Sequence, residues 1–214
     1  MLGGIFPIMS GKQSEQKNSY SAQQLKRYWE LIQPRLVVID PSVVSTGVAW
    51  YQENRQYCNS IVQSYDRPQI EKLRYLKVGL HYLYQLKRHR MSGDKAIITI
   101  IESAAYTAIS RSKSFISEAR GVLLSVAIDY GDFVTLPIST WKKIFTQDGH
   151  ASKDLIQSVA TQLNLPFSNQ DECDAVAMLH ATRSMFVDWG AYSVSAAVNA
   201  YIDQLVAAAE RLKA

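Results

Sequence analysis

The sequence predicts an α/β protein built on a mixed five-stranded sheet flanked by helices. Two continuous aliphatic runs, residues 36–39 and 97–101, have the composition of central strands that are covered on both faces. Amphipathic segments of helical period follow these strands along the chain. A hydrophobic fraction of 47% over 214 residues is enough to fill one core.

Residues 1–34 are expected to form a flexible leader and one short helix outside the main domain. Residues 10–20 are rich in Ser, Gln, Lys and Asn, a composition typical of a flexible segment. Ser21 is a suitable N-cap for a helix that runs through Gln33, and Pro34 ends it. The sequence assigns no chemistry to this part of the chain.

The main domain is expected to open with three closely spaced strands. After the first aliphatic run, residues 45–51 and 57–65 have strand composition, which favours an antiparallel meander. Pro68 then begins an amphipathic helix, which Gly93 and Asp94 end. One side of this helix is apolar and comprises Ile70, Leu73, Leu76, Leu80 and Leu83.

The rest of the domain alternates helices with strands. The second aliphatic run is followed by a helix over residues 114–130 and a strand over 133–137. Three strands, a helix, a strand, a helix, a strand and then helices is the element order of the RNase H-like fold. Later helices are expected from Thr140, Ser152 and Glu172, with a last one over residues 192–213. The predicted division is a leader (1–34), an RNase H-like domain (35–190) and a helical C-terminal extension (191–214).

Charge and hydropathy limit the class of protein. Lys and Arg total 23 against 19 Asp and Glu, and this net charge of +4 mildly favours a polyanionic partner. No run of about 18 apolar residues is present, so we expect no membrane span. The apolar start, residues 1–9, is short and lacks the basic region of a signal peptide. A cytoplasmic protein is therefore expected.

The cysteines and histidines do not have the spacing of a metal or triad site. Cys58 and Cys173 are far apart in sequence and neither belongs to a CxxC pair, which favours two buried, reduced thiols. The four histidines also lack the spacing of metal ligands or of a Ser-His-Asp triad. They are His81, His89, His150 and His180.

Four acidic residues are the candidates for chemistry: Asp40, Glu102, Asp171 and Asp174. Asp40 and Glu102 each follow a buried aliphatic strand, where a carboxylate is costly to desolvate unless something pairs with it. Two such strand ends in one mixed sheet would bring both acids to the same edge. Asp171 and Asp174 lie three positions apart at the start of a helix, so they share one face, and the helix dipole favours their charge.

Each acid also has an ordinary structural interpretation. Asp40 can begin the Pro41–Ser42 turn, Glu102 can pair with an arginine, and Asp171 can cap the helix that carries Asp174. The combination is what favours a metal site, because four carboxylates provide the oxygen donors that Mg²⁺ or Mn²⁺ prefers. Two such ions about 4 Å apart suit phosphodiester hydrolysis.

Five segments around these acids form an ordered set of motifs: an Asp-Pro turn with Thr-Gly (Asp40–Gly47), a strand-end acid (Ile101–Glu102), an Ala-Arg-Gly helix (Glu118–Val122), a Lys-rich segment (Pro137–Lys153) and Asp-x-x-Asp-Ala (Asp171–Ala175). The set resembles the RuvC-type Holliday-junction resolvases of the RNase H-like superfamily. The resemblance runs from about residue 36 to residue 186, in the family's order and spacing. Each motif alone is weak, whereas the ordered set is fairly specific.

The resemblance implies a homodimer that nicks opposed strands of a four-way DNA junction symmetrically, with two Mg²⁺ ions per site held by the four acids. It also implies that Lys142 and Lys153 contact phosphates, a role that suits a mobile point charge. Lys143 and Arg120 belong to the same motifs and are expected to contact DNA. Solvated surface charge is the alternative for the lysines. Such an enzyme is expected in the cytoplasm, on nucleoid DNA or in a host cell if the chain is viral.

Two departures from the family pattern leave the substrate open. Ser42 replaces the usual Gly of the first turn, and Ala104 and Ala105 precede Tyr106, where the family often has a Phe that wedges into the junction. Tyr106 can stack on an unpaired base or pack in the core. The alternatives are a related nuclease acting on flaps, replication intermediates or RNA–DNA hybrids, and a non-catalytic DNA-binding relative.

Overall fold

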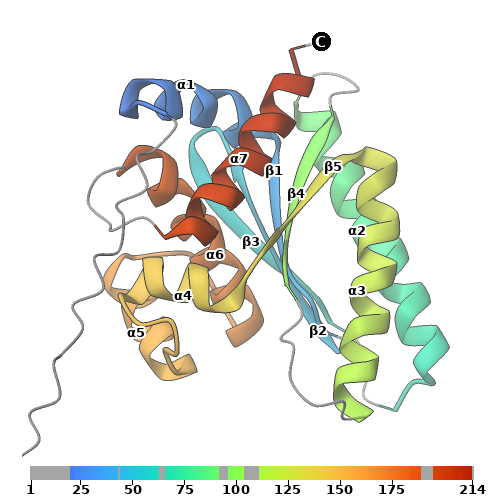
Figure 1. The fold of residues 1–214 in the computed structure, drawn as a ribbon. Helices are drawn as coiled ribbons and strands as arrows, with labels where there is room; N and C mark the ends of the chain where they lie inside the picture. The colour runs from blue at the N-terminus through green and yellow to red at the C-terminus, as the bar shows by residue number, and fades with distance from the viewer. Residues whose placement is uncertain are drawn as a thin grey trace, which may run out of the picture.

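The computed structural model describes residues 20–42, 44–62, 66–91, 96–103, 111–188 and 195–213. These residues form three layers around a central sheet (Figure 1). Helices α2 (Gln69–Arg90) and α3 (Arg111–Tyr130) cover one face, and the other face is covered by α4 (Ile138–Thr146), α5 (Lys153–Gln162), α6 (Gln170–Val187) and α7 (Ala196–Arg211). None of the helices in these ranges is long and apolar enough to cross a membrane.

The sheet is mixed and has five strands in the order β3-β2-β1-β4-β5. β2 pairs antiparallel with both β1 and β3, whereas β4 pairs parallel with both β1 and β5. This confirms the predicted mixed five-stranded sheet, including the antiparallel meander at its start. The strands are β1 (Leu36–Asp40), β2 (Ser45–Gln52), β3 (Arg55–Val62), β4 (Ile97–Glu102) and β5 (Gly131–Leu136).

Two hydrophobic clusters cover the two faces of the sheet, because side chains alternate along each strand. Ile39 and Ile101 face α2 and α3, whereas Val38 and Ile100 face α6. Since Ile39 and Ile101 are register partners in the parallel pair, β1 and β4 end at the same level. The helices on the first face are α2 (Gln69–Arg90) and α3 (Arg111–Tyr130).

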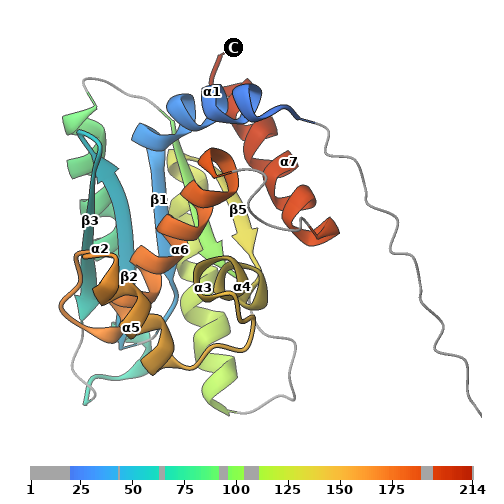
Figure 2. The same cartoon turned by 90° about the vertical axis from the view of Figure 1, so that its left-hand side faces the viewer.

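Helix α6 is the central helix of the second face and is buried along most of its length. Figure 2 shows it in front of the sheet, with α4 and α5 beside its first half and α1 and α7 beside its second half. Nearly every side chain of its middle is apolar or small, which lets neighbours pack around it on all sides. The helices of this face are α1 (Ala22–Ile32), α4 (Ile138–Thr146), α5 (Lys153–Gln162), α6 (Gln170–Val187) and α7 (Ala196–Arg211), and a 3₁₀ turn (Gln33–Arg35) joins α1 to β1.

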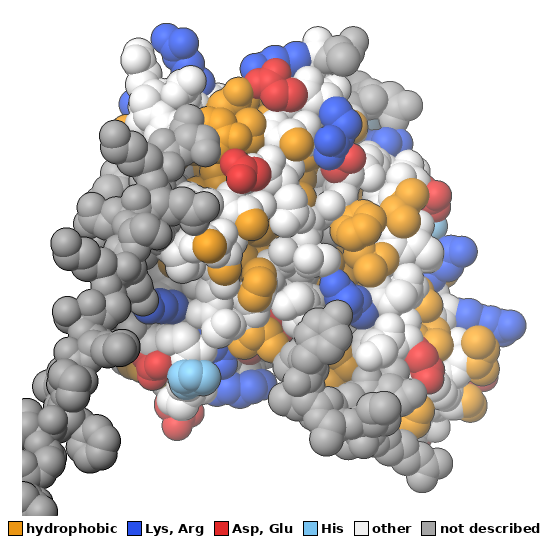
Figure 3. All heavy atoms as spheres, viewed as in Figure 1, with side chains coloured by type: hydrophobic (Ala, Val, Ile, Leu, Met, Phe, Trp, Pro, Cys, Tyr) orange, Lys and Arg blue, Asp and Glu red, His pale blue; other side chains and the backbone are white. Residues whose placement is uncertain are grey.

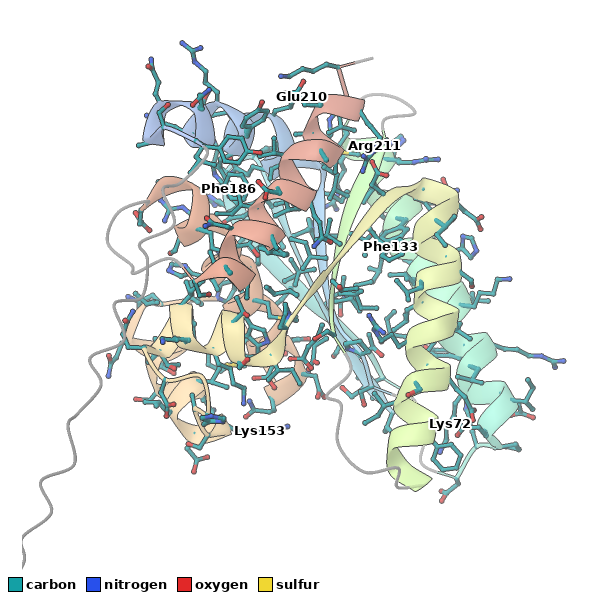
Figure 4. All side chains as sticks on the ribbon, in the orientation of Figure 1. Lys72, Phe133, Lys153, Phe186, Glu210 and Arg211 are labelled. Atoms are coloured by element: carbon teal, nitrogen blue, oxygen red, sulfur yellow. The ribbon has the colours of Figure 1, made fainter. Side chains whose placement is uncertain are left out.

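The first and last helices share the core of the central domain. Trp29 of α1 packs edge-on against Tyr51 of β2, at a ring-centroid distance of 5.5 Å. Arg211 of α7 forms a salt bridge of 3.0 Å with Asp132 at the start of β5 (Figure 4). The boundaries at residues 34 and 190 remain a prediction, but α1 and α7 pack on the same core cluster as the sheet.

The buried face of α2 differs from the predicted one. Ile70 is 57% exposed, contrary to the prediction that it belongs to the apolar stripe. α2 crosses β3 at Gly79, where an added Cβ would lie 2.8 Å from Cγ2 of Ile61. The buried face therefore lies around and after this contact, with Leu73 and Leu83 at its border. Its buried side chains are Leu76, Leu80, Tyr84 and Lys87.

Lys87 is a cation inside this packed face and is only 6% exposed. Its Nζ donates a hydrogen bond of 3.1 Å to the backbone carbonyl of Tyr51. Burial lowers the pKa of Lys87 from 10.5 to about 8, because the charged form is desolvated. The folded protein therefore carries a charge that destabilises it below this pH.

We expect the protein to become more stable relative to the Lys87→Met variant as the pH rises from about 8 toward 10.5. The folded-state pKa of Lys87 is lowered, so between these values the unfolded chain binds more protons and the free energy of unfolding rises with pH. The slope is at most about 1.4 kcal/mol per pH unit. Denaturant titrations of both proteins across this range measure it. A difference in stability that is independent of pH would contradict it.

Candidate active site

The ends of β1 and β4 place two predicted acids side by side. Asp40 and Glu102 directly follow the register partners Ile39 and Ile101. Because strand side chains alternate, both acids are on the face of the sheet that α6 covers. Asp40 is also the antiparallel partner of Gly47 on β2.

The start of α6 brings the other two acids to the same place. Gly47 touches this start so closely that an added Cβ would lie 1.9 Å from the carbonyl oxygen of Asp171. Asn169 caps the helix by accepting a hydrogen bond of 2.9 Å from the backbone N–H of Glu172. Asp171 therefore lies in the first turn of α6, and Asp174 follows on the same face of the helix. This helix start lies against β2, the strand whose Gly47 pairs with Asp40.

The electrostatics of Asp40 show that the four acids interact. Burial is the largest cause that raises the pKa of Asp40 well above its usual value, and repulsion from Glu102, Asp174 and Asp171 raises it further. Lys153 lowers it in part. The structure thus brings together the four acids that the sequence separates by as many as 134 positions, since 174 − 40 = 134.

Two neutral side chains hold the carboxylates in place. Nε1 of Trp141 donates a hydrogen bond of 2.8 Å to Oε1 of Glu102, and Nε2 of Gln170 donates one of 3.1 Å to Oδ1 of Asp174. Burial nevertheless raises the pKa of Glu102 to about 6, against the lowering effect of Trp141. Burial also raises the pKa of Asp174, against Lys153 and Gln170.

Trp141 and Gln170 were not predicted as part of the site. Trp141 lies in the helix predicted from Thr140. If its indole is buried there, the N–H needs a hydrogen-bond acceptor, and this requirement is the signal that could have indicated a contact with an acid. Gln170 gives no signal in the sequence, since an amide beside two acids has many ordinary interpretations. Its contact follows from the i, i+4 geometry of α6.

The donor set fits a hard divalent cation. Within the ranges that the structure describes, no three His, Cys, Asp or Glu side chains are close enough to enclose a metal ion as they stand. The four carboxylates supply only oxygen donors, and burial with mutual repulsion raises the pKa of Asp40 and Glu102. A divalent cation would remove the repulsion and draw the side chains together.

The ordinary interpretations of the acids are not what the contacts show. The turn after β1 is held by Ser42 and Thr46, because Thr46 Oγ1 donates to the Ser42 carbonyl at 2.6 Å. The Ser42 hydroxyl accepts from the backbone N–H of Ser45 at 3.4 Å, so the departure from the family's Gly adds a turn contact. Glu102 accepts from Trp141 and not from an arginine among the described contacts, and Asn169 is the helix cap.

The predicted basic residues differ in their relation to the carboxylates. Lys153 is the first residue of α5, exposed at the lower end of the molecule in Figure 4, and it lowers the pKa of three of the acids. Lys142 lowers the pKa of Glu102 and Asp174, while its Nζ donates to the Ala151 carbonyl at 2.8 Å. Figure 3 shows basic side chains beside a histidine near α4 and α5.

The other three predicted DNA contacts stay predictions. Lys143 is exposed on α4. Arg120 lies on α3, across the sheet from α6, and its buried Nε has no hydrogen-bond partner among the described atoms. Tyr106 lies outside the described residues.

Glu172 is a buried acid whose structural role the sequence did not indicate. It accepts hydrogen bonds from Ser60 Oγ at 3.1 Å and from the hydroxyl and backbone N–H of Ser168 at 2.6 and 2.8 Å. Desolvation raises its pKa, but these bonds and one from the Cys58 thiol outweigh it, so the pKa is lowered. Glu172 therefore ties the start of α6 to β3. Both Cys58 and Cys173 are free thiols, but only Cys173 is buried as predicted, whereas Cys58 on β3 is half-buried.

The strand order β3-β2-β1-β4-β5, with β2 antiparallel and β4 parallel to β1, is that of an RNase H-like fold, and solved structures of RuvC share this fold. A structure of Thermus thermophilus RuvC has a TM-score of 0.51 and 16% identity, covering 68% of this chain and 91% of that one. T. thermophilus RuvC in complex with Holliday junction substrate has a TM-score of 0.52 and 15% identity, covering 71% and 96%. No protein-family model and no curated protein matches the sequence.

Replacing Gly47 by Ala is expected to weaken Mn²⁺ binding at least about tenfold, a loss of about 1.4 kcal/mol. The added Cβ meets the backbone of Asp171, so the start of α6 must move and carry Asp171 and Asp174 with it. Gly121→Ala is the matched control, because its Cβ enters open space on α3 and Ala favours the helix by about 1 kcal/mol. Calorimetric titration with Mn²⁺ and thermal unfolding measure both effects. Unchanged Mn²⁺ affinity in folded Gly47→Ala would show that the close contact at Gly47 does not position Asp171 and Asp174 for metal binding.

Proposed function

We propose that this chain is a nuclease that hydrolyses phosphodiester bonds at the junction of branched DNA, with four-way junctions as its substrate. The observation that carries the proposal is the placement of four carboxylates at one edge of the sheet by the register of β1 with β4 and by the contact of Gly47 with the start of α6. The RuvC-like fold supports it, since one of the similar structures contains a Holliday junction substrate.

The four acids Asp40, Glu102, Asp171 and Asp174 would hold two Mg²⁺ ions, with Mn²⁺ as an alternative. When bound, such ions supply an activated water and neutralise charge on the phosphate that is cut. Trp141 orients Glu102 and Gln170 orients Asp174 through their hydrogen bonds. The carboxylates also belong to β1, β4 and α6 rather than to loops, which fixes their geometry.

The lysines beside this site would bind the DNA backbone. Lys153 and Lys142 are close enough to the acids to lower the pKa of Glu102 and Asp174. A phosphate placed between them and the carboxylates would meet positive charge on its other side. The protein would act as a homodimer, because symmetric nicks in opposed strands need two such sites.

Asp174→Asn is expected to lower Mg²⁺-dependent cutting of a synthetic four-way junction at least about 10³-fold, because it removes one charged ligand from the site. Binding of the junction should persist, since the lysines remain. Cleavage and gel-shift assays on the same preparations measure the two effects. Asp129→Asn is the control, because Asp129 is exposed on α3, across the sheet from α6.

The outcomes separate the candidate functions. Paired symmetric nicks in the junction support the proposal, whereas preferential cutting of a flap or an RNA–DNA hybrid favours a related nuclease. Undiminished cutting by Asp174→Asn would refute the site. Absence of Mn²⁺ binding by calorimetry would favour a DNA-binding relative without catalysis.

Lys153→Ala is expected to flatten the dependence of junction affinity on salt by about one unit of the log–log slope, the effect of losing one phosphate contact. Lys26→Ala is the matched control, because Lys26 is exposed on α1, at the opposite end of the molecule from α5 (Figure 1). Fluorescence anisotropy at several salt concentrations gives both slopes. Equal slopes for wild type and Lys153→Ala would remove Lys153 from the interface.

A further inference from the structure

A concave pocket lies at the other end of the sheet from the carboxylates. It has a volume of about 610 Å³ and is bounded by the 3₁₀ turn before β1, the end of β2 with its turn, and the end of α2. The acids follow the last residues of β1, whereas Arg35 of this pocket precedes its first residue. The pocket is therefore separate from the proposed active site.

Lys87 gives this pocket a buried positive charge. Its side chain lines the pocket although the residue is 6% exposed. An ammonium has three N–H donors, and the carbonyl of Tyr51 is the one acceptor that Lys87 has among the described residues. No carboxylate contributes to the shift of its pKa, which burial alone lowers to about 8. A buried cation without a counter-charge is costly unless an anion can neutralise it.

The rest of the lining suits an organic anion. Arg35 and Arg90 add two cations, and the indole of Trp50 adds an aromatic surface. This indole also stacks with the ring of Tyr57, at a centroid distance of 6.3 Å. Arg90 is held at the rim by a hydrogen bond to the amide oxygen of Gln52. The two acids of the lining, Glu30 and Glu53, are exposed, so water screens their charge.

We propose that this pocket binds a small phosphate monoester with an aromatic body, its phosphate beside Lys87 and Arg35 and its ring against Trp50. The volume lies within the range of about 300–1,000 Å³ typical of small-ligand sites. A small molecule fits better than the backbone of a duplex, because the ammonium of Lys87 is enclosed while the lysines beside the carboxylates are exposed or half-exposed. The inference does not depend on the proposed nuclease activity.

The test titrates the full chain at pH 7 with adenosine 5′-monophosphate, inorganic phosphate and adenosine, by calorimetry and by thermal unfolding. We expect the monophosphate to bind and to raise the Tm, inorganic phosphate to bind more weakly, and adenosine not to bind. In Lys87→Met the affinity for the monophosphate should fall at least tenfold. Asp174→Asn should retain the wild-type affinity, which distinguishes this pocket from the carboxylate site.

Lys87→Met is also expected to be at least as stable as wild type without ligand, because it removes a desolvated charge. A loss of binding in that variant is therefore not explained by unfolding. Equal binding of the monophosphate by wild type and Lys87→Met would overturn the proposal, as would no binding of either phosphate. If Lys87→Met lowers only the affinity for junction DNA, the pocket is a DNA contact and the proposal is wrong.

Discussion

The contact between Gly47 of β2 and the start of α6 is the constraint on which the candidate site depends. The sheet fixes Asp40 and Glu102 through register alone, but Asp171 and Asp174 reach them only because the helix begins against the strand. A side chain at position 47 would keep these layers apart. Glu172 holds the same helix start through Ser168 and through Ser60, the register partner of Gly47 on β3, so packing and buried hydrogen bonds act together.

The electrostatic cost of this arrangement is only partly offset within the chain. Burial and repulsion raise the pKa of Asp40 and Glu102, while Lys153 and the indole of Trp141 oppose the shift. Such a cluster destabilises the free protein, and costly features of this kind concentrate at functional sites. A divalent cation would relieve the repulsion, which explains how the same residues could be costly to the free protein and useful to a metal-bound one.

The sheet and the positions of the four acids could be predicted from the sequence, because strands that end in acids and a helix with two acids three positions apart leave strong local patterns. The contacts that depend on packing leave no such local pattern in the sequence. Gly79 set the buried face of α2 and made the prediction for Ile70 wrong, since only the approach to β3 decides which side is covered. The roles of Gln170 and Glu172 likewise depend on partners that the chain brings together only when it folds.

The two ends of β1 are chemically opposite, and their separation is what allows both to exist. Asp40 ends the strand among carboxylates, while Arg35 precedes it beside the buried ammonium of Lys87. Five residues of strand span roughly 13 Å between their first and last Cα atoms, well beyond the roughly 4 Å at which an ion pair forms. Placed closer, Lys87 would pair with the acids and cancel both sites. The sheet thus holds the carboxylate cluster and the proposed anion pocket a strand length apart.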